Sequence, residues 1–288
     1  MSQYYCLIAG LPNISLDDSK IPFSLSEFRN ELDGILTDAD KALIHLFFLK
    51  FDNQNLIAQL NLPDSDFDDK GSITFDEFQE FITVLKGEDR PPANKKIRAY
   101  FVDFVRLYLA AQEADEKTAV SWEDRLTTMY YNYAIECSNQ FVSAWFELNL
   151  NINNVLTAIT CRKYGMEKAD YIIGNNETAE NLRTSNARDF GLGNNMEYLP
   201  DVQRIAEETD LLSREKKIDV LKWQWLEENT FFKSFSVESV FAYVIRLEMI
   251  ERWTTLDRTL GEKTFRELIG EMKTGSNHTL NEFKRNNK

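Results

Sequence analysis

The sequence has few of the residue types that most often carry chemistry. It contains only two histidines, His45 and His278, and three cysteines, Cys6, Cys137 and Cys161. His45 lies in an apolar run, where a histidine is more often a hydrogen-bonded core residue than a base, and His278 lies in a polar tail. The cysteines are odd in number and far apart, which argues against a disulfide framework and fits a reducing cytoplasm.

Long apolar runs and strand-like patterns are also scarce. No stretch approaches the roughly 20 apolar residues that a membrane-spanning helix needs, and the amino terminus lacks the positively charged region of a signal peptide. We therefore expect a cytoplasmic protein that reaches a membrane only through another protein. Alternating β-branched runs, which indicate strands, are nearly absent, so the predicted fold class is all-α.

The sequence has fewer positively charged than negatively charged residues. The 33 lysines and arginines stand against 47 aspartates and glutamates, which gives a net charge of −14. An acidic surface repels nucleic-acid phosphates and anionic lipid headgroups, so neither is expected as a main partner. A basic protein surface is accommodated more easily, although the same charge can serve solubility alone.

No arrangement typical of an enzyme is present. Neither histidine has a cysteine or serine beside it in a recognisable motif. Gly191 and Gly193 lack the third glycine and the strand–turn–helix context of a dinucleotide site. Cys161 precedes two basic residues, but at the end of a predicted helix, where the helix dipole disfavours a thiolate. We expect no active site of its own and no cofactor.

The helices are predicted from apolar residues at helical spacing, from capping residues and from helix breakers. They are expected at residues 24–35, 42–51, 74–86, 93–113, 121–137, 139–148, from the second copy of the repeated pattern described below to near 165, 210–228, 237–255 and 261–273. The first of them is expected to be capped by Ser24 or Ser26. Residues 3–9 are expected to be extended, and residues 171–199 to be a connection with one short helix. Within the 237–255 helix, Glu248 and Arg252 form an i,i+4 pair, which fits either a modest surface ion pair or an interface contact.

One short pattern occurs three times, at residues 51–57, 150–156 and 235–241. Each copy places a residue suited to helix capping before an apolar run: Asp52, Asn151 and Ser236. Apolar residues flank each cap at the spacing of a hydrophobic staple. Each copy is therefore expected to start a helix, although staples are common enough for three to coincide.

The spacing of the three copies predicts the domain organisation. The capping positions lie 99 and 85 residues apart, which suggests three related helical domains at residues 1–90, 91–195 and 196–288. The helix-start positions expected to form repeated contacts or interfaces are Asp52, Asn55, Leu56, Asn151, Asn154, Val155, Ser236, Glu238, Ser239 and Tyr243.

The acidic stretch 66–77 resembles an EF-hand calcium loop. Its acidic residues match loop positions 1, 3 and 12: Asp66, Asp68 and Glu77. Lys70 stands at position 5, where calcium needs an oxygen ligand, and a cation there repels the ion. The alternative is an acidic turn in which Thr74 and Glu77 form a capping box for the following helix.

A family resemblance appears in the third copy of the pattern. Residues 236–251 resemble the C-terminal helix of the C-type subunit of V-type ATPases, whose eukaryotic counterpart is the d-type subunit. Shorter stretches are similar to other parts of that family: Asn55-Leu56, Asn154-Val155, and residues 162–165 and 261–268. Residues 4–12 look like a divergent bacterial family associated with V-type ATPase genes. The first copy departs from the pattern, since Ala58-Gln59-Leu60 lacks the arginine that usually follows.

The resemblance implies a fold and a role. It implies three similar helical domains arranged as a funnel with pseudo-threefold symmetry. It also implies a cytoplasmic rotor subunit in the central stalk, which joins the central shaft to the membrane proteolipid ring and passes torque during ion or proton transport. Two alternatives come from the residues alone: a calcium-responsive binding protein that uses the 66–77 loop, and an all-α enzyme whose site is assembled across domains.

Overall fold

The computed structural model describes residues 4–62, 65–87, 94–114, 120–193 and 195–256. These residues form eleven α-helices and one short 3-10 helix and contain no strand, which confirms the all-α prediction. None of the helices in these ranges is both long and apolar enough to cross a membrane. The division into three domains stays a prediction.

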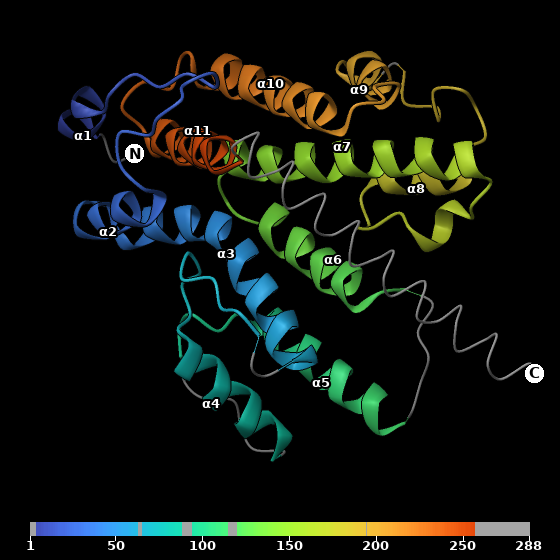
Figure 1. Ribbon diagram of the computed structural model, residues 1–288, viewed down its shortest axis with the longest axis horizontal. Coiled ribbons are helices and arrows are strands. Elements are labelled where there is room, and N and C mark those ends of the chain that lie inside the picture. Colours follow the sequence, from blue (N-terminus) through green and yellow to red (C-terminus); the bar gives the residue numbers. More distant parts are fainter. Residues whose placement is uncertain (1–3, 63–64, 88–93, 115–119, 194, 257–288) are drawn as a thin grey trace, which may run out of the picture.

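Figure 1 shows the order of the elements along the chain. They are α1 (Tyr5–Gly10), α2 (Leu25–Ile35), α3 (Asp38–Asn61), α4 (Phe75–Lys86), α5 (Ala99–Glu113), α6 (Trp122–Ile135), α7 (Gln140–Tyr164), η1 (Lys168–Asp170), α8 (Glu177–Thr184), α9 (Leu199–Ala206), α10 (Leu211–Thr230) and α11 (Val237–Thr255).

Two helices begin at the capping boxes that the sequence contains. Ser24 and Glu27 exchange backbone and side-chain hydrogen bonds at the start of α2. Thr74 and Glu77 do the same at the start of α4. Because each box satisfies two backbone N–H groups that a helix start leaves free, both helices start where the sequence places them.

The predicted helix starts at Asp52 and Asn151 are wrong. The 24 residues of α3 and the 25 residues of α7 run through these positions without a break. The apolar residues before each position continue the helix, so the backbone N–H groups that a cap would bind are already bonded within the helix. The two polar side chains are therefore free to bind other parts of the chain.

Of three other segments, two differ from their predicted structure and one agrees with it. Within the segment expected to be extended at 3–9, residues 5–9 lie in α1, because a short apolar and aromatic run does not by itself separate strand from helix. Helix α9 is an addition to the predicted helices, whereas α8 is the one short helix expected between 171 and 199. The expected helix at 261–273 lies outside the described residues.

Helix α11 joins helices from different parts of the chain. Ten of its 19 residues are buried, and it contacts α2, α3, α7 and α10. A second set of contacts joins α6 to α3, α5 and α7. In Figure 1, α10 lies at the top of the view with α7 below it, and α3 and α6 lie side by side in the lower half. The core is continuous from α2 to α11.

Candidate functional site

Asn55 and Asn154 make the same unusual contact on the two longest helices. Asn55 Oδ1 accepts a hydrogen bond from the backbone N–H of Asp68 at 2.8 Å, and its Nδ2 donates to the Asp68 carbonyl at 2.9 Å. Asn154 binds Ile173 in the same two-way manner, at 3.1 and 2.7 Å. Each buried amide thus satisfies both backbone groups of one residue in the loop that follows its helix.

A second polar residue lies one helical turn earlier on each helix. Asp52 Oδ1 accepts from the backbone N–H groups of Ser72 and Ile73, at 2.8 and 3.0 Å. Asn151 Oδ1 accepts from the side chain of Asn176 at 2.8 Å, and Asn176 in turn caps α8. Residues three apart share a helix face, so each pair holds one loop. We call residues 68–73 and 172–176 the two clamped loops.

An arginine holds each clamped loop from a short helix. Arg29 of α2 donates to the carbonyls of Lys70 and Gly71, at 2.7 and 2.6 Å. Arg183 of α8 donates to the carbonyls of Ile172 and Gly174, at 3.0 and 2.5 Å. Neither arginine was predicted as a site residue, because nothing in the local sequence distinguishes them from other surface cations.

Each clamped loop places a glycine close to side chains of its helix. A Cβ atom on Gly71 would lie 2.5 Å from Asp52 Oδ1. A Cβ atom on Gly174 would lie 2.7 Å from Leu150 Cδ2, and Gly174 also has a φ of +80°, a region that favours glycine. The two loops are thus held in equivalent ways, with clamping residues 99 positions apart in the sequence.

The third copy of the pattern is used differently. Ser236 stands at the capping position of α11, but its side chain accepts no cap hydrogen bond. Instead, the hydroxyls of Ser236 and Ser239 both donate to the carbonyl of Lys233, at 2.7 and 2.6 Å. The prediction of a capping side chain is therefore wrong here, and the third copy holds no loop of the kind found after α3 and α7.

The remaining predicted interface positions serve the core or tie segments together. Leu56 and Val155 are completely buried. Glu238 is buried and accepts from Asn139 Nδ2 at 3.0 Å, which links the start of α11 to the residue that caps α7. Tyr243 donates through its hydroxyl to the carbonyl of Pro12 at 3.1 Å.

Of the three acidic residues that match the EF-hand loop, Asp66 is exposed, whereas Asp68 and Glu77 are bound to the protein itself. Asp68 Oδ1 accepts from the backbone N–H of Lys70 at 2.9 Å. Glu77 accepts from the Thr74 backbone at 2.8 Å, from Lys96 at 2.9 Å and from Asn94 at 3.1 Å. Burial alone would raise the pKa of Glu77, but these hydrogen bonds outweigh it and lower that pKa to about 2. In the described ranges, no three His, Cys, Asp or Glu side chains gather as a metal site would require.

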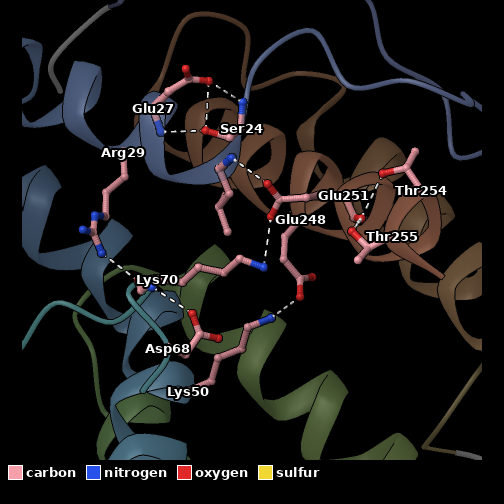
Figure 2. A network of polar contacts seen from close by, with 11 residues as sticks. Ser24, Glu27, Arg29, Lys50, Asp68, Lys70, Glu248, Glu251, Thr254 and Thr255 are labelled. Carbon is pink, nitrogen blue, oxygen red and sulfur yellow. Dashed lines mark hydrogen bonds and ion pairs between the residues drawn. The ribbon is translucent and has the colours of Figure 1, made fainter. Parts of the chain in front are cut away.

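Ion pairs join α3 and the first clamped loop to α11, as Figure 2 shows. Lys50 Nζ lies 2.6 Å from the carboxylate of Glu248, and Lys70 Nζ lies 3.2 Å from that of Glu251. Glu251 also accepts from the backbone N–H of Leu25, the first residue of α2, at 3.2 Å. Lys70, which is misplaced for a calcium ligand, is thus well placed to hold its loop to α11.

The predicted surface ion pair between Glu248 and Arg252 is wrong, whereas an interface contact stays a prediction. Each residue reaches another helix instead: Glu248 pairs with Lys50 of α3, and Arg252 pairs with the buried carboxylate of Asp219 on α10. Trp253 Nε1 donates to the same carboxylate at 2.6 Å. Partners on neighbouring helices compete with partners on the same helix, and sequence spacing shows only the latter.

The titratable groups singled out in the sequence have ordinary structural partners. His45 is half-buried, its Nε2 lies 3.2 Å from Asp33 Oδ1, and burial lowers its pKa. Cys161 is buried at the end of α7, where burial raises the pKa of its thiol. Asp52 is an exception. Burial raises its pKa to about 6, although two backbone hydrogen bonds oppose this shift. Among the described residues, its Oδ2 has no partner.

Comparison with known proteins gives a family for almost the whole chain. Residues 1–276 match a family described as "Protein of unknown function (DUF2764)". The chain belongs to the DUF2764 family. No curated protein and no solved structure matches it.

Proposed function

We propose that this DUF2764 protein is a non-catalytic rotor subunit of the central stalk of a V-type ATPase. In this role it couples the central shaft to the membrane proteolipid ring during ion transport. It is cytoplasmic and reaches the membrane only through the complex. The proposal includes three helical domains, 1–90, 91–195 and 196–288, arranged as a funnel around a pseudo-threefold axis.

The position of α11 is the observation that favours this role most. Residues 236–251, the stretch that resembles the C-type subunit of V-type ATPases, form the start and most of α11. This helix contacts α2 and α3 of the first proposed domain, α7 of the second and α10 of the third. A helix that touches all three domains is well placed to carry force between them.

A torque-transmitting subunit also needs stiff connections between its helices. Loops usually open at a low free-energy cost because few buried contacts hold them. The two clamped loops are instead fixed by an asparagine and an arginine each, and the first is also tied to α11 through Lys70 and Glu251. These contacts support a body that rotates as one piece.

One surface feature suits contact with a partner protein. Phe231 and Phe232 lie in the turn between α10 and α11 and are 72% and 93% exposed. Their rings contact each other with centroids 4.8 Å apart. Exposed aromatic side chains of this kind are frequent anchors of protein interfaces. We propose them as a contact with the ATPase, while the net charge of −14 steers basic surfaces of the partner.

The proposal is tested by direct binding. The full chain is immobilised and offered purified shaft subunits or a detergent-solubilised proteolipid ring, at low and high salt. We expect binding that weakens as salt increases. A Phe231→Ser, Phe232→Ser double variant should bind less, while Tyr164→Ser, which removes a 67%-exposed aromatic elsewhere, should bind as the wild type does. Failure of both partners to bind contradicts the role, and salt-independent binding contradicts the electrostatic part.

A further inference from the structure

A cavity of about 310 Å³ opens where five helices meet. Its walls come from α3, α6, α7, α10 and α11, and they combine aromatic rings with charged side chains. Tyr131 and Trp145 contribute two of the rings. The volume is at the lower end of the range that small-molecule sites occupy.

The charges in this cavity do not balance. Three cations and two carboxylates line it: Lys50, Lys222, Arg252, Asp219 and Glu248. Lys50 pairs with Glu248 at 2.6 Å, and Arg252 pairs with Asp219. Each carboxylate therefore already has a cation. Among the described residues, the side chain of Lys222 makes no hydrogen bond or ion pair, so the cavity holds one surplus positive charge.

The surplus charge is unfavourable where it stands. Lys222 is only partly exposed, and burial lowers its pKa; Arg252 and Lys50 lower it further, while Asp219 opposes them. A charged amine with cationic neighbours and few water contacts lacks the counter-charge that a buried ion requires. The cavity carries net positive charge, whereas the chain as a whole has a net charge of −14.

We propose that this cavity binds a small organic anion. The carboxylate or phosphate group of the ligand would accept hydrogen bonds from Lys222, and its flat apolar body would lie against Tyr131 and Trp145. A charge-assisted hydrogen bond to an ammonium group supplies orientation and affinity, and the aromatic walls supply apolar contact. The site is independent of the ATPase role, since it depends only on the cavity and its charges.

The experiment uses the full chain and three probes: benzoate, phenyl phosphate and inorganic phosphate. Binding is measured by calorimetry and by tryptophan fluorescence, because Trp145 lines the cavity. We expect both aromatic anions to bind, whichever acidic group they carry, and inorganic phosphate to bind more weakly because it lacks the apolar body. A preference of about tenfold between benzoate and phenyl phosphate identifies the acidic group of the ligand.

Two variants separate the site from general charge effects. Lys222→Gln should weaken binding of the aromatic anions by about tenfold or more. Lys217→Gln removes the same charge from the same helix, but at an exposed pair with Glu208, and should leave binding unchanged. Without a ligand, Lys222→Gln should melt no lower than the wild type, because it removes an unpaired charge. Anion should raise the melting temperature of the wild type but not of Lys222→Gln.

Clear results would overturn the proposal. Absence of binding to the wild type at concentrations up to about 10 mM contradicts it. So does equal binding by the wild type and Lys222→Gln, which would place the anion elsewhere. A loss of binding in Lys217→Gln equal to that in Lys222→Gln would reduce the effect to net charge and would also contradict a specific site.

Discussion

Asn55 and Asp68 exchange two hydrogen bonds, one in each direction, between the C-terminal half of α3 and the loop that follows it. The amide of Asn55 acts as a peptide group would in a sheet, and it fixes one residue of an otherwise irregular segment. Asn154 and Ile173 repeat the arrangement on α7. The loops that follow α3 and α7 are therefore held by the same pair of hydrogen bonds.

Removing either amide should loosen its loop. We expect Asn55→Ala and Asn154→Ala each to lower the free energy of unfolding by about 2 kcal/mol, because a backbone N–H and a carbonyl lose their partners. Gln54→Ala, at an exposed position of α3, should change stability by less than about 0.5 kcal/mol. Urea denaturation gives the values. A loss of the same size in Gln54→Ala would mean that the clamps contribute nothing specific.

Asp52 should make stability depend on pH. Its pKa is about 6 in the folded protein, against an ordinary value of 3.8. Between these values the unfolded chain releases the proton and the folded chain keeps it, so stability falls as the pH rises through this window, by up to about 3 kcal/mol. Above pH 6 both forms are ionised and the loss is complete.

The variant Asp52→Asn isolates this effect. It should remove that part of the pH dependence. Between pH 4 and pH 7 the free energy of unfolding of the wild type should therefore fall relative to that of the variant. The second clamp already carries asparagine at the equivalent position, Asn151. The variant Asn151→Asp should therefore add a pH dependence of the kind that Asp52→Asn removes. That variant should lose more stability at pH 8 than at pH 5, because burial disfavours the ionised carboxylate. Parallel curves for wild type and Asp52→Asn would refute the assignment.

The contact between Lys70 and Glu251 should couple the first clamped loop to α11. In a double-mutant cycle with Lys70→Met and Glu251→Gln, we expect a coupling energy of about 0.5–1 kcal/mol, since the pair is only partly exposed. The exposed pair Asp201–Arg204, treated in the same way, should give less than about 0.5 kcal/mol. A coupling energy near zero for Lys70 and Glu251 would remove this link.

Calcium should leave the protein unchanged. Glu77 holds Lys96 and the start of α4, and Asp68 is engaged with the backbone of its own loop. Calcium needs six to eight oxygen ligands, so binding would require these contacts to break. Titration with calcium should give no saturable change in tryptophan fluorescence or melting temperature. A saturable change that disappears in Glu77→Gln would restore the calcium-binding alternative.

Local signals in the sequence were enough for part of this structure. Thr74 starts its helix as predicted, Ser24 rather than Ser26 starts α2, and the apolar spacing of 237–255 predicts both ends of α11. The polar pairs at 52 and 55 and at 151 and 154 were recognised as equivalent. Their role was mistaken, because an aspartate or asparagine before an apolar run looks the same whether it caps a helix or binds a distant loop.

The rest depended on contacts between residues far apart in the chain. Lys70 and Glu251 are 181 positions apart, and no local pattern links them. Arg29 and Arg183 became recognisable only once the loops that they hold were in place. The surplus charge at Lys222 likewise follows from how five helices meet, since its neighbours Lys50 and Arg252 belong to other helices.

The ATPase role is tested most directly by capturing the tagged full chain from its native cells in gentle detergent and identifying the recovered proteins by mass spectrometry. We predict that the shaft and proteolipid subunits of a V-type ATPase are recovered with it. Recovery of neither, under conditions in which the ATPase itself remains intact, would contradict this role.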